Sequence, residues 1–249
     1  MFGTLALDNS DLVNLILICF FAGLIRGFSG FGLSAFVMSL ALTIIPPIEL
    51  IPVCWWMEFF ASVYMIKNGW KDSDKKISII LWFGAIFGLP IGILLTTILD
   101  FQTSKIVALV LILILALILL RNFKILFLST TVGTISSGVF AGIATGLASI
   151  GGMIVATYVL ASQNSARRMR ASLVLYILLN SITTFIFLFI FDVMDQKAFM
   201  RGVLLAFPSS IGVVLGSILF MQRLEKYYRP FSLGLLISFS LVGLIRFIG

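Results

Sequence analysis

Long apolar stretches with almost no charged residues dominate the chain. Four of them cover residues 48–66, 77–99, 106–120 and 172–191. A helix that crosses the hydrocarbon core of a bilayer needs about 20 mostly apolar residues, and these stretches approach or reach that length. The pattern therefore predicts an all-α polytopic membrane protein, formed by a single membrane domain over residues 1–249.

Two further apolar stretches, 12–45 and 132–162, are interrupted near their middles by glycine and small polar residues. The interruption in the first stretch contains Arg26, Gly27, Ser29, Gly30 and Gly32. The interruption in the second contains Thr145, Gly146, Ser149, Gly151 and Gly152. Because glycine weakens a helix and accepts backbone shapes that other residues resist, we expect each stretch to form two shorter helical arms joined by an irregular loop.

The distribution of lysine and arginine predicts how the broken stretches meet the bilayer, because these residues gather in cytoplasmic loops. If both stretches cross fully, nine basic residues fall on one side and seven on the other. If both turn back as re-entrant hairpins, twelve fall on one side and four on the other, and Arg26 in the first break completes the 17. We therefore expect hairpins, three full crossings in each half, and both termini on the periplasmic side.

The two broken stretches belong to an internal repeat. The motif at 21–27 recurs at 140–146, 119 positions later. A second pattern recurs 124 positions later, and its glycines are Gly88, Gly92, Gly212 and Gly216. Close helix packing alone would also explain such glycine pairs, but the preserved order of the matches favours a duplication.

The predicted boundaries place repeat one at 11–124 and repeat two at 129–249. Since each half has an odd number of full crossings, the second half must be inverted relative to the first. Inverted repeats with broken helices are typical of secondary transporters, whose binding sites form where the broken helices meet. The organisation thus favours transport over catalysis.

The two breaks form the predicted substrate site. Backbone groups outside a helix at membrane depth need protein or a polar cavity around them, and each arm after a break begins with N–H groups that carry about half a positive charge. Two such ends facing each other would bind a small anion. Hydroxyl groups at the breaks can donate to an anionic oxygen or cap a helix. The candidate substrate-binding residues are Arg26, Gly27, Ser29, Gly30, Gly32, Thr145, Gly146, Ser149, Gly151 and Gly152.

Two charged side chains lie inside predicted apolar segments. A guanidinium at membrane depth usually marks a transport pathway, so Arg26 is interpreted as a substrate-binding or gating residue, unless it pairs with Glu58 or reaches the interface. A carboxyl group at the depth of Glu58 suits proton coupling, or it neutralises Arg26. Asn180 occupies the equivalent place in the other half. Glu58 and Asn180 are therefore the coupling candidates.

Composition argues against several other functions. The chain contains no histidine, and its acidic residues and cysteines do not cluster at metal-ligand spacing, so we expect no metal and no other cofactor. The segment 27–30 has the form of an intramembrane serine protease motif, but such a serine needs a histidine base. The segment 30–35 matches a dinucleotide motif without its βαβ unit. The basic residues behind the net charge of +7 are scattered singly, which indicates orientation in the bilayer rather than nucleic-acid binding.

The segment 21–32, its weaker copy at 140–152 and the Pro46–Pro47 turn resemble the sulfite exporter TauE/SafE family, also called toluene sulfonate uptake permeases. This resemblance covers essentially the whole chain. It implies a carrier of the bacterial inner membrane for sulfite or for organosulfonates such as taurine and sulfoacetate. Carried over by position, the two glycine-rich breaks would form the central site, with Thr145 where the first copy has Arg26.

From the sequence we thus expect a secondary transporter of small sulfur-containing oxyanions, coupled to H⁺ or Na⁺ and not an enzyme. Its partners would be the lipid bilayer, a small anion and, in one reading, further copies of the chain. A small-carboxylate transporter of the same architecture and an anion channel remain open alternatives.

Overall fold

The structure is a computed structural model of the whole chain and describes residues 8–42, 44–100, 130–161 and 165–221, with isolated positions within 102–114 and 227–245. This part of the chain is helical and has no strands, as the sequence predicts. The predicted span 106–120 and the boundary between the repeats at 121–129 lie largely outside the described residues.

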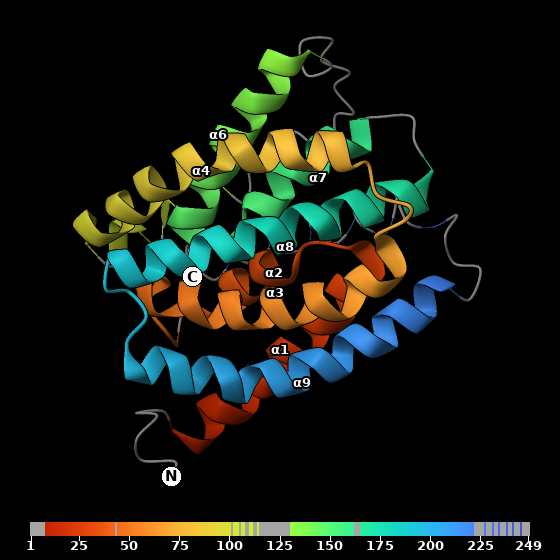
Figure 1. Cartoon of the computed structure of the whole chain (residues 1–249). Helices are drawn as coiled ribbons and strands as arrows, with labels where there is room; N and C mark the ends of the chain where they lie inside the picture. The colour runs from red at the N-terminus through yellow and green to blue at the C-terminus, as the bar shows by residue number, and fades with distance from the viewer. Residues whose placement is uncertain are drawn as a thin grey trace.

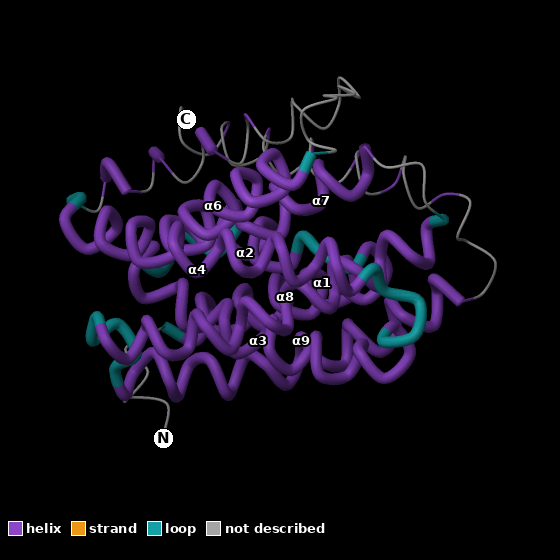
Figure 2. The backbone as a smooth tube through the Cα atoms, turned by 45° about the horizontal axis from the view of Figure 1, so that its top comes forward, coloured by secondary structure: helices purple, strands orange, loops and turns teal. Residues whose placement is uncertain are grey.

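Eight helices form the described part of the bundle (Figure 1): α1 (Asn9–Ser29), α2 (Leu33–Ala41), α3 (Pro47–Gly69), α4 (Lys75–Ile98), α6 (Thr131–Ala148), α7 (Gly151–Ala161), α8 (Ala166–Ile190) and α9 (Gln196–Met221). Six of them are long and apolar enough to cross a membrane, namely α1, α3, α4, α6, α8 and α9. The helices lie side by side with their connecting loops at the two ends of the bundle (Figure 2). The protein is therefore a polytopic membrane protein.

Both broken stretches turn at residues with left-handed backbone geometry. Gly30 has φ 82° and Gly32 φ 89°, and Ser149, the counterpart of Gly30, has φ 56°. The N–H of Gly30 donates to the carbonyl of Arg26 at 2.8 Å, and that of Ser149 to the carbonyl of Thr145 at 2.7 Å. Positive φ favours glycine and is uncommon for serine. Both helices therefore end in the same kind of C-terminal turn.

The second broken stretch folds back as a helical hairpin. At its tip the N–H of Ile150 donates to the carbonyl of Ala144 at 3.2 Å. Near its open end the hydroxyls of Thr134 and Tyr158 form a hydrogen bond of 2.8 Å. These two contacts show that α7 runs antiparallel to α6. The hairpin shape agrees with the sequence analysis, while its depth in a bilayer stays a prediction.

The two arms of each broken stretch differ in length, and the irregular segment between them is shorter than predicted. The outgoing helices α1 and α6 have 21 and 18 residues, and the return helices α2 and α7 have 9 and 11. Residues 26–29 and 145–148, expected in irregular loops, are helical. Gly27 does not break α1, because it packs so closely on Val213 of α9 that a Cβ atom would overlap that residue's carbonyl.

Two pairs of helices pack through glycine contacts that recur with the spacing of the repeat. On α1, a Cβ atom at Gly23 would meet the backbone of Ser209 on α9. On α6, a Cβ atom at Gly142 would meet the backbone of Ala85 on α4. Gly142 follows Gly23 by 119 positions and Ser209 follows Ala85 by 124. The recurrence supports our inference of a duplicated fold.

Equivalent helices of the two halves run in opposite directions. Near one end of α3 the indole N–H of Trp55 donates to the carbonyl of Ser181 on α8 at 2.8 Å. Just beyond the other end of α3, the N–H of Asp74 donates to the hydroxyl of Ser172 at 2.8 Å. Since residue numbers rise along α3 while they fall along α8, the two helices are antiparallel. This geometry supports, as an inference, an inverted second half.

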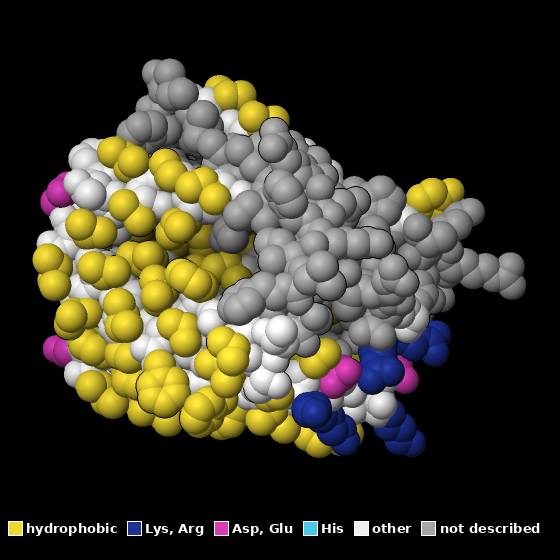
Figure 3. All heavy atoms as spheres, turned by 90° about the horizontal axis from the view of Figure 1, so that it is seen from above, with side chains coloured by type: hydrophobic (Ala, Val, Ile, Leu, Met, Phe, Trp, Pro, Cys, Tyr) yellow, Lys and Arg dark blue, Asp and Glu magenta, His cyan; other side chains and the backbone are white. Residues whose placement is uncertain are grey.

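Charge separates the two ends of the bundle. The α3–α4 turn contacts the start of α8 through an ion pair of 3.0 Å between Arg168 and Asp74. Exposed basic side chains at this end are Lys67, Lys71, Lys75, Lys76, Arg167 and Arg168. Figure 3 shows lysine and arginine gathered at one end of the molecule and hydrophobic side chains along its flank. The flank suits lipid contact, and the basic end suits the cytoplasmic side.

Replacing Gly88 with valine is expected to lower the free energy of unfolding by about 3 kcal/mol. A Cβ atom at this position would overlap the carbonyl of Val139 and approach the backbone N–H of Ile143, both on α6. Because these are backbone atoms, they cannot rotate away. Thermal unfolding in detergent measures the effect. Gly234→Val is the control, since an added Cβ atom there meets no atom within 4 Å. Equal melting temperatures for the two variants would contradict the close packing of α4 on α6.

Candidate functional site

A small, partly open cavity lies where the starts of the two return helices approach α3 and α8. Its lining comes from both broken stretches and from both long helices. The lining residues are Gly32, Ser34, Ala35, Trp55, Glu58, Thr145, Ser149, Ile150, Gly152, Met153, Tyr176, Ile177, Asn180, Ser181 and Thr184. The cavity therefore joins parts of the chain that are more than 100 residues apart.

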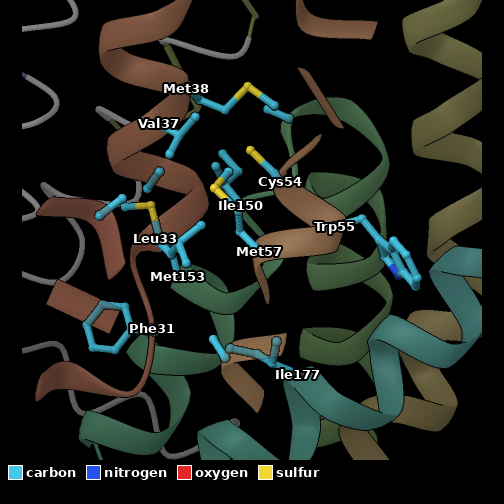
Figure 4. Packing of buried hydrophobic residues seen from close by; sticks show 14 of the residues in the cluster. Phe31, Leu33, Val37, Met38, Cys54, Trp55, Met57, Ile150, Met153 and Ile177 are labelled. Carbon is cyan, nitrogen blue, oxygen red and sulfur yellow. The ribbon is translucent and has the colours of Figure 1, made fainter. Parts of the chain in front are cut away.

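Apolar side chains hold the two return helices together beside this cavity. Leu33 at the start of α2, Met153 on α7 and Met57 on α3 belong to one buried hydrophobic cluster. Figure 4 shows their side chains, together with Ile150, in the centre of the packing. This packing fixes the N-terminal ends of α2 and α7 at the same cavity.

Six of the twelve predicted substrate-binding and coupling residues line the cavity, and the other six do not. The predicted residues that line it are Gly32, Thr145, Ser149, Gly152, Glu58 and Asn180. The predicted residues that do not line it are Arg26, Gly27, Ser29, Gly30, Gly146 and Gly151. Whether any of them binds substrate stays a prediction, and for the second group it would require a different conformation.

Arg26 is fully buried and hydrogen-bonded within the first half. Its Nε donates to Glu58 Oε2 at 2.6 Å, and its Nη2 donates to Ser62 Oγ at 2.8 Å. Its Nη1 donates to the carbonyl of Gly30 in the break. The guanidinium therefore ties α1 and its break to α3, and of the two interpretations left open by the sequence, the geometry favours pairing with Glu58 over direct contact with substrate.

Ser29 and Gly151 have packing and capping contacts instead of a place in the cavity wall. The hydroxyl of Ser29 donates at 2.8 Å to the carbonyl of Ile25, and it accepts the N–H of Phe31 at 3.2 Å. Gly151 lies so close to Thr145 that a Cβ atom would overlap the threonine hydroxyl. These two residues shape the breaks.

Glu58 places a carboxylate in the cavity wall. Its side chain is 12% exposed, whereas that of Arg26 is 0% exposed. The hydroxyl of Ser34, in the first turn of α2, donates to Glu58 Oε1 at 3.1 Å. Because Arg26 balances its charge, Glu58 can remain beside a bound anion without a full like-charge repulsion.

The first turns of α2 and α7 contribute positive partial charge to the cavity. Neither helix has an acidic residue in its first turn, and no side chain caps the N-terminus of α2. The first N–H groups of a helix have no partner within it, and they carry about half a positive charge in sum. Both ends open into one cavity, an arrangement that favours the binding of a small anion.

The sequence profile of the sulfite exporter TauE/SafE family matches residues 15–243. The chain belongs to this family. TauE/SafE membership implies a membrane transporter of sulfite or related sulfur anions, in a family of transporters rather than enzymes. No curated protein and no solved structure matches the chain.

Within this TauE/SafE fold, α8 supplies cavity residues that the sequence analysis missed. The missed lining residues are Ser34, Ala35, Trp55, Ile150, Met153, Tyr176, Ile177, Ser181 and Thr184. Five of the lining residues on α8, counting Asn180, are spaced by one, three or four positions, which places them on one helical face. Extending that spacing from Asn180 would have found the four missed residues of α8, which are Tyr176, Ile177, Ser181 and Thr184.

Arg170 belongs to α8 and contacts the end of α1. Its Nη2 donates to the carbonyl of Gly27 and, at 3.1 Å, to the hydroxyl of Ser217. Its guanidinium lies 4.5 Å from the ring centre of Phe220. This role has no signature in the sequence, because Arg170 follows two other basic residues, Arg167 and Arg168, which are exposed. Arg170 instead joins the tip of the first hairpin to α8 and α9.

Proposed function

We propose that the protein is a secondary transporter that binds a small sulfur-containing oxyanion, such as sulfite, taurine or sulfoacetate, in the cavity between α2, α3, α7 and α8. The observation that carries the proposal is that the N-terminal ends of α2 and α7, one from each half, open into the same cavity. Backbone N–H groups would bind the anion, with hydroxyl groups such as that of Ser149 beside them.

Coupling to an ion gradient is assigned in this proposal to Glu58. It is a carboxyl group that lines the cavity, contacts the first turn of α2 through Ser34 and faces no histidine or other carboxylate among the residues that line the cavity. Taking up a proton would weaken its pairing with Arg26 and change the charge beside the substrate. Asn180, at the equivalent position on α8, has an amide side chain that stays uncharged and cannot take up a proton in the same way.

The proposed setting is the bacterial inner membrane, with the basic end of the bundle in the cytoplasm. Lysine and arginine prefer that side, and the exposed basic residues of the α3–α4 turn and the start of α8 lie together. Alternating access would open the cavity first to one face and then to the other.

A ligand screen tests the proposal. Sulfite, sulfate, taurine, sulfoacetate, isethionate, lactate and acetate are each added to the purified protein in detergent. A substrate at about 100 times its Kd stabilises the folded state by about 2.7 kcal/mol, so the melting temperature should rise by roughly 5 °C or more. We expect this shift with a sulfur oxyanion. Stabilisation by lactate or acetate alone would indicate that the substrate is a small carboxylate and not a sulfur oxyanion. If none of the anions stabilises the protein, the proposal is contradicted.

A cavity variant shows whether the stabilising anion binds where we propose. Gly152→Val is suitable because the added Cβ atom would lie 3.1 Å from Cδ1 of Ile177, a flexible side-chain end that can move aside. The valine would fill space next to the first N–H groups of α7 and is expected to abolish the ligand shift. Gly234→Val should retain it. An unchanged shift in Gly152→Val would place the anion elsewhere.

A further inference from the structure

Two residues of α8 that line the cavity each have a buried polar group without a hydrogen-bond partner in the described part of the chain. These groups are the hydroxyl of Tyr176 and Oδ1 of Asn180. Tyr176 is 0% exposed and Asn180 is 6% exposed. Buried polar groups are nearly always paired in folded proteins, because an unpaired one loses its hydration without compensation. A ligand in the cavity would provide the missing partners.

The hydrogen bonds of Thr145 determine which end of the Asn180 amide faces the cavity. The Thr145 hydroxyl donates its one hydrogen to the carbonyl of Ala141 at 2.8 Å. Its oxygen can therefore only accept from Asn180, whose Nδ2 lies 3.4 Å away. This leaves the amide oxygen of Asn180 as the open group, and that oxygen is an acceptor.

The corresponding face of α3 has its polar groups occupied. One carboxylate oxygen of Glu58 accepts from Arg26, and the other accepts from Ser34. The hydroxyl of Ser62, one helical turn further along α3, also accepts from Arg26. Since the α3 side chains satisfy one another within the first half, the side chains with open hydrogen-bonding capacity at the cavity are those of α8.

Tyr176 and Asn180 differ in the partner that each requires. They are four positions apart and therefore neighbours on the helix surface. The phenolic hydroxyl of Tyr176 can donate to an anionic oxygen, whereas Oδ1 of Asn180 accepts and requires a donor. One small ligand that satisfies both groups has an oxyanion at one end and a hydrogen-bond donor close to it.

Resting on the transport function proposed above, we propose that Tyr176 and Asn180 select small oxyanions that also carry a hydrogen-bond donor. Tyr176 donates to the sulfur oxyanion, and Asn180 accepts from a hydroxyl or ammonium group of the same substrate. A two-carbon sulfonate with a terminal hydroxyl or ammonium group has this chemistry. A sulfonate with a plain alkyl tail does not.

A matched pair of ligands tests the substrate class. Isethionate and ethanesulfonate differ only by the terminal hydroxyl of isethionate. Equilibrium binding to the purified full-length protein is expected to be about tenfold tighter for isethionate, which corresponds to one neutral hydrogen bond. In Asn180→Leu the preference should disappear. A wild-type protein that binds both ligands equally, or binds neither although it binds an oxyanion that carries no hydrogen-bond donor, would overturn the proposed class.

Tyr176→Phe tests the donor to the oxyanion and is expected to weaken binding of every bound sulfur oxyanion by about tenfold. The melting temperature without ligand should stay the same or rise, because the lost hydroxyl has no partner. Tyr158→Phe is the control, since the Tyr158 hydroxyl bonds to Thr134 away from the cavity; it should keep the affinity.

Unchanged affinity in Tyr176→Phe would refute the role of the hydroxyl while leaving transport intact. If Tyr176→Phe does not fold, the ligand preference of Asn180→Leu still decides the proposal. If the wild-type protein binds none of the oxyanions, the proposed function fails and this inference fails with it.

Discussion

Replacing Arg26 with methionine is expected to destabilise the protein by about 3–5 kcal/mol. The variant would leave the carboxylate of Glu58 in the protein interior without its cation, and it would remove the bonds to Ser62 and to the carbonyl of Gly30 in the break. Breaking a buried ion pair from one side costs more than the pair contributes, because the remaining charge stays desolvated. Unfolding in detergent, followed by intrinsic tryptophan fluorescence, measures the loss.

The double variant Arg26→Met/Glu58→Met separates this explanation from a direct role in binding. Removing both charges should restore most of the stability. The control is Arg168→Met, whose partner is Asp74 on the surface; the arginine side chain is 52% exposed there, so the change should cost about 1 kcal/mol or less. If Arg26→Met kept full stability and lost only ligand binding, Arg26 would be a substrate residue, as the sequence alone suggested.

Glu58→Gln is expected to remove the dependence of transport on a pH gradient while the affinity for substrate changes less than about threefold. Glutamine has nearly the same shape, and its amide oxygen can still accept from Arg26 while its nitrogen has no titratable proton. Uptake and counterflow of labelled substrate in proteoliposomes, with and without a pH gradient, measure the two properties. Counterflow should persist, because exchange needs no net driving force.

Glu49→Gln is the matched control for Glu58→Gln. Glu49 lies on the same helix and pairs with Arg201, and its side chain is 41% exposed outside the cavity. This variant should keep the response to the gradient. If Glu58→Gln transports substrate with an unchanged pH dependence, proton coupling through this carboxylate is wrong, and a sodium gradient becomes the alternative to measure.

The sequence predicted the helical class and the places of the breaks because both depend on local properties. Apolar length defines a membrane span, and Gly30 and Gly32 permit the positive φ that ends one helix and starts the next. The extent of the breaks could not be predicted in the same way. Gly27 resembles a helix breaker in sequence, yet it lies within α1 because α9 packs directly on it.

Only part of the site could be predicted, because the sequence shows which residues are polar but not which way the tertiary packing turns them. Glu58 and Asn180 stand out as polar residues in apolar segments, and both line the cavity. Arg26 stands out equally in the sequence. The direction of its side chain, however, depends on the position of the Glu58 carboxylate on α3, and tertiary packing determines that position. Tyr176 gave no signal, since a tyrosine in an apolar span is unremarkable until its hydroxyl is found buried without a partner.

The two glycine-packed pairs each combine one helix from either half of the sequence. Helix α1 packs along α9, and α4 packs along α6. The two halves of the sequence are therefore intertwined. Neither 11–124 nor 129–249 would form a compact unit by itself, because each half packs its helices against helices of the other. Any rigid unit that moves during a transport cycle would consist of such a mixed pair, so a hinge should be sought between these pairs and not at the boundary between the repeats.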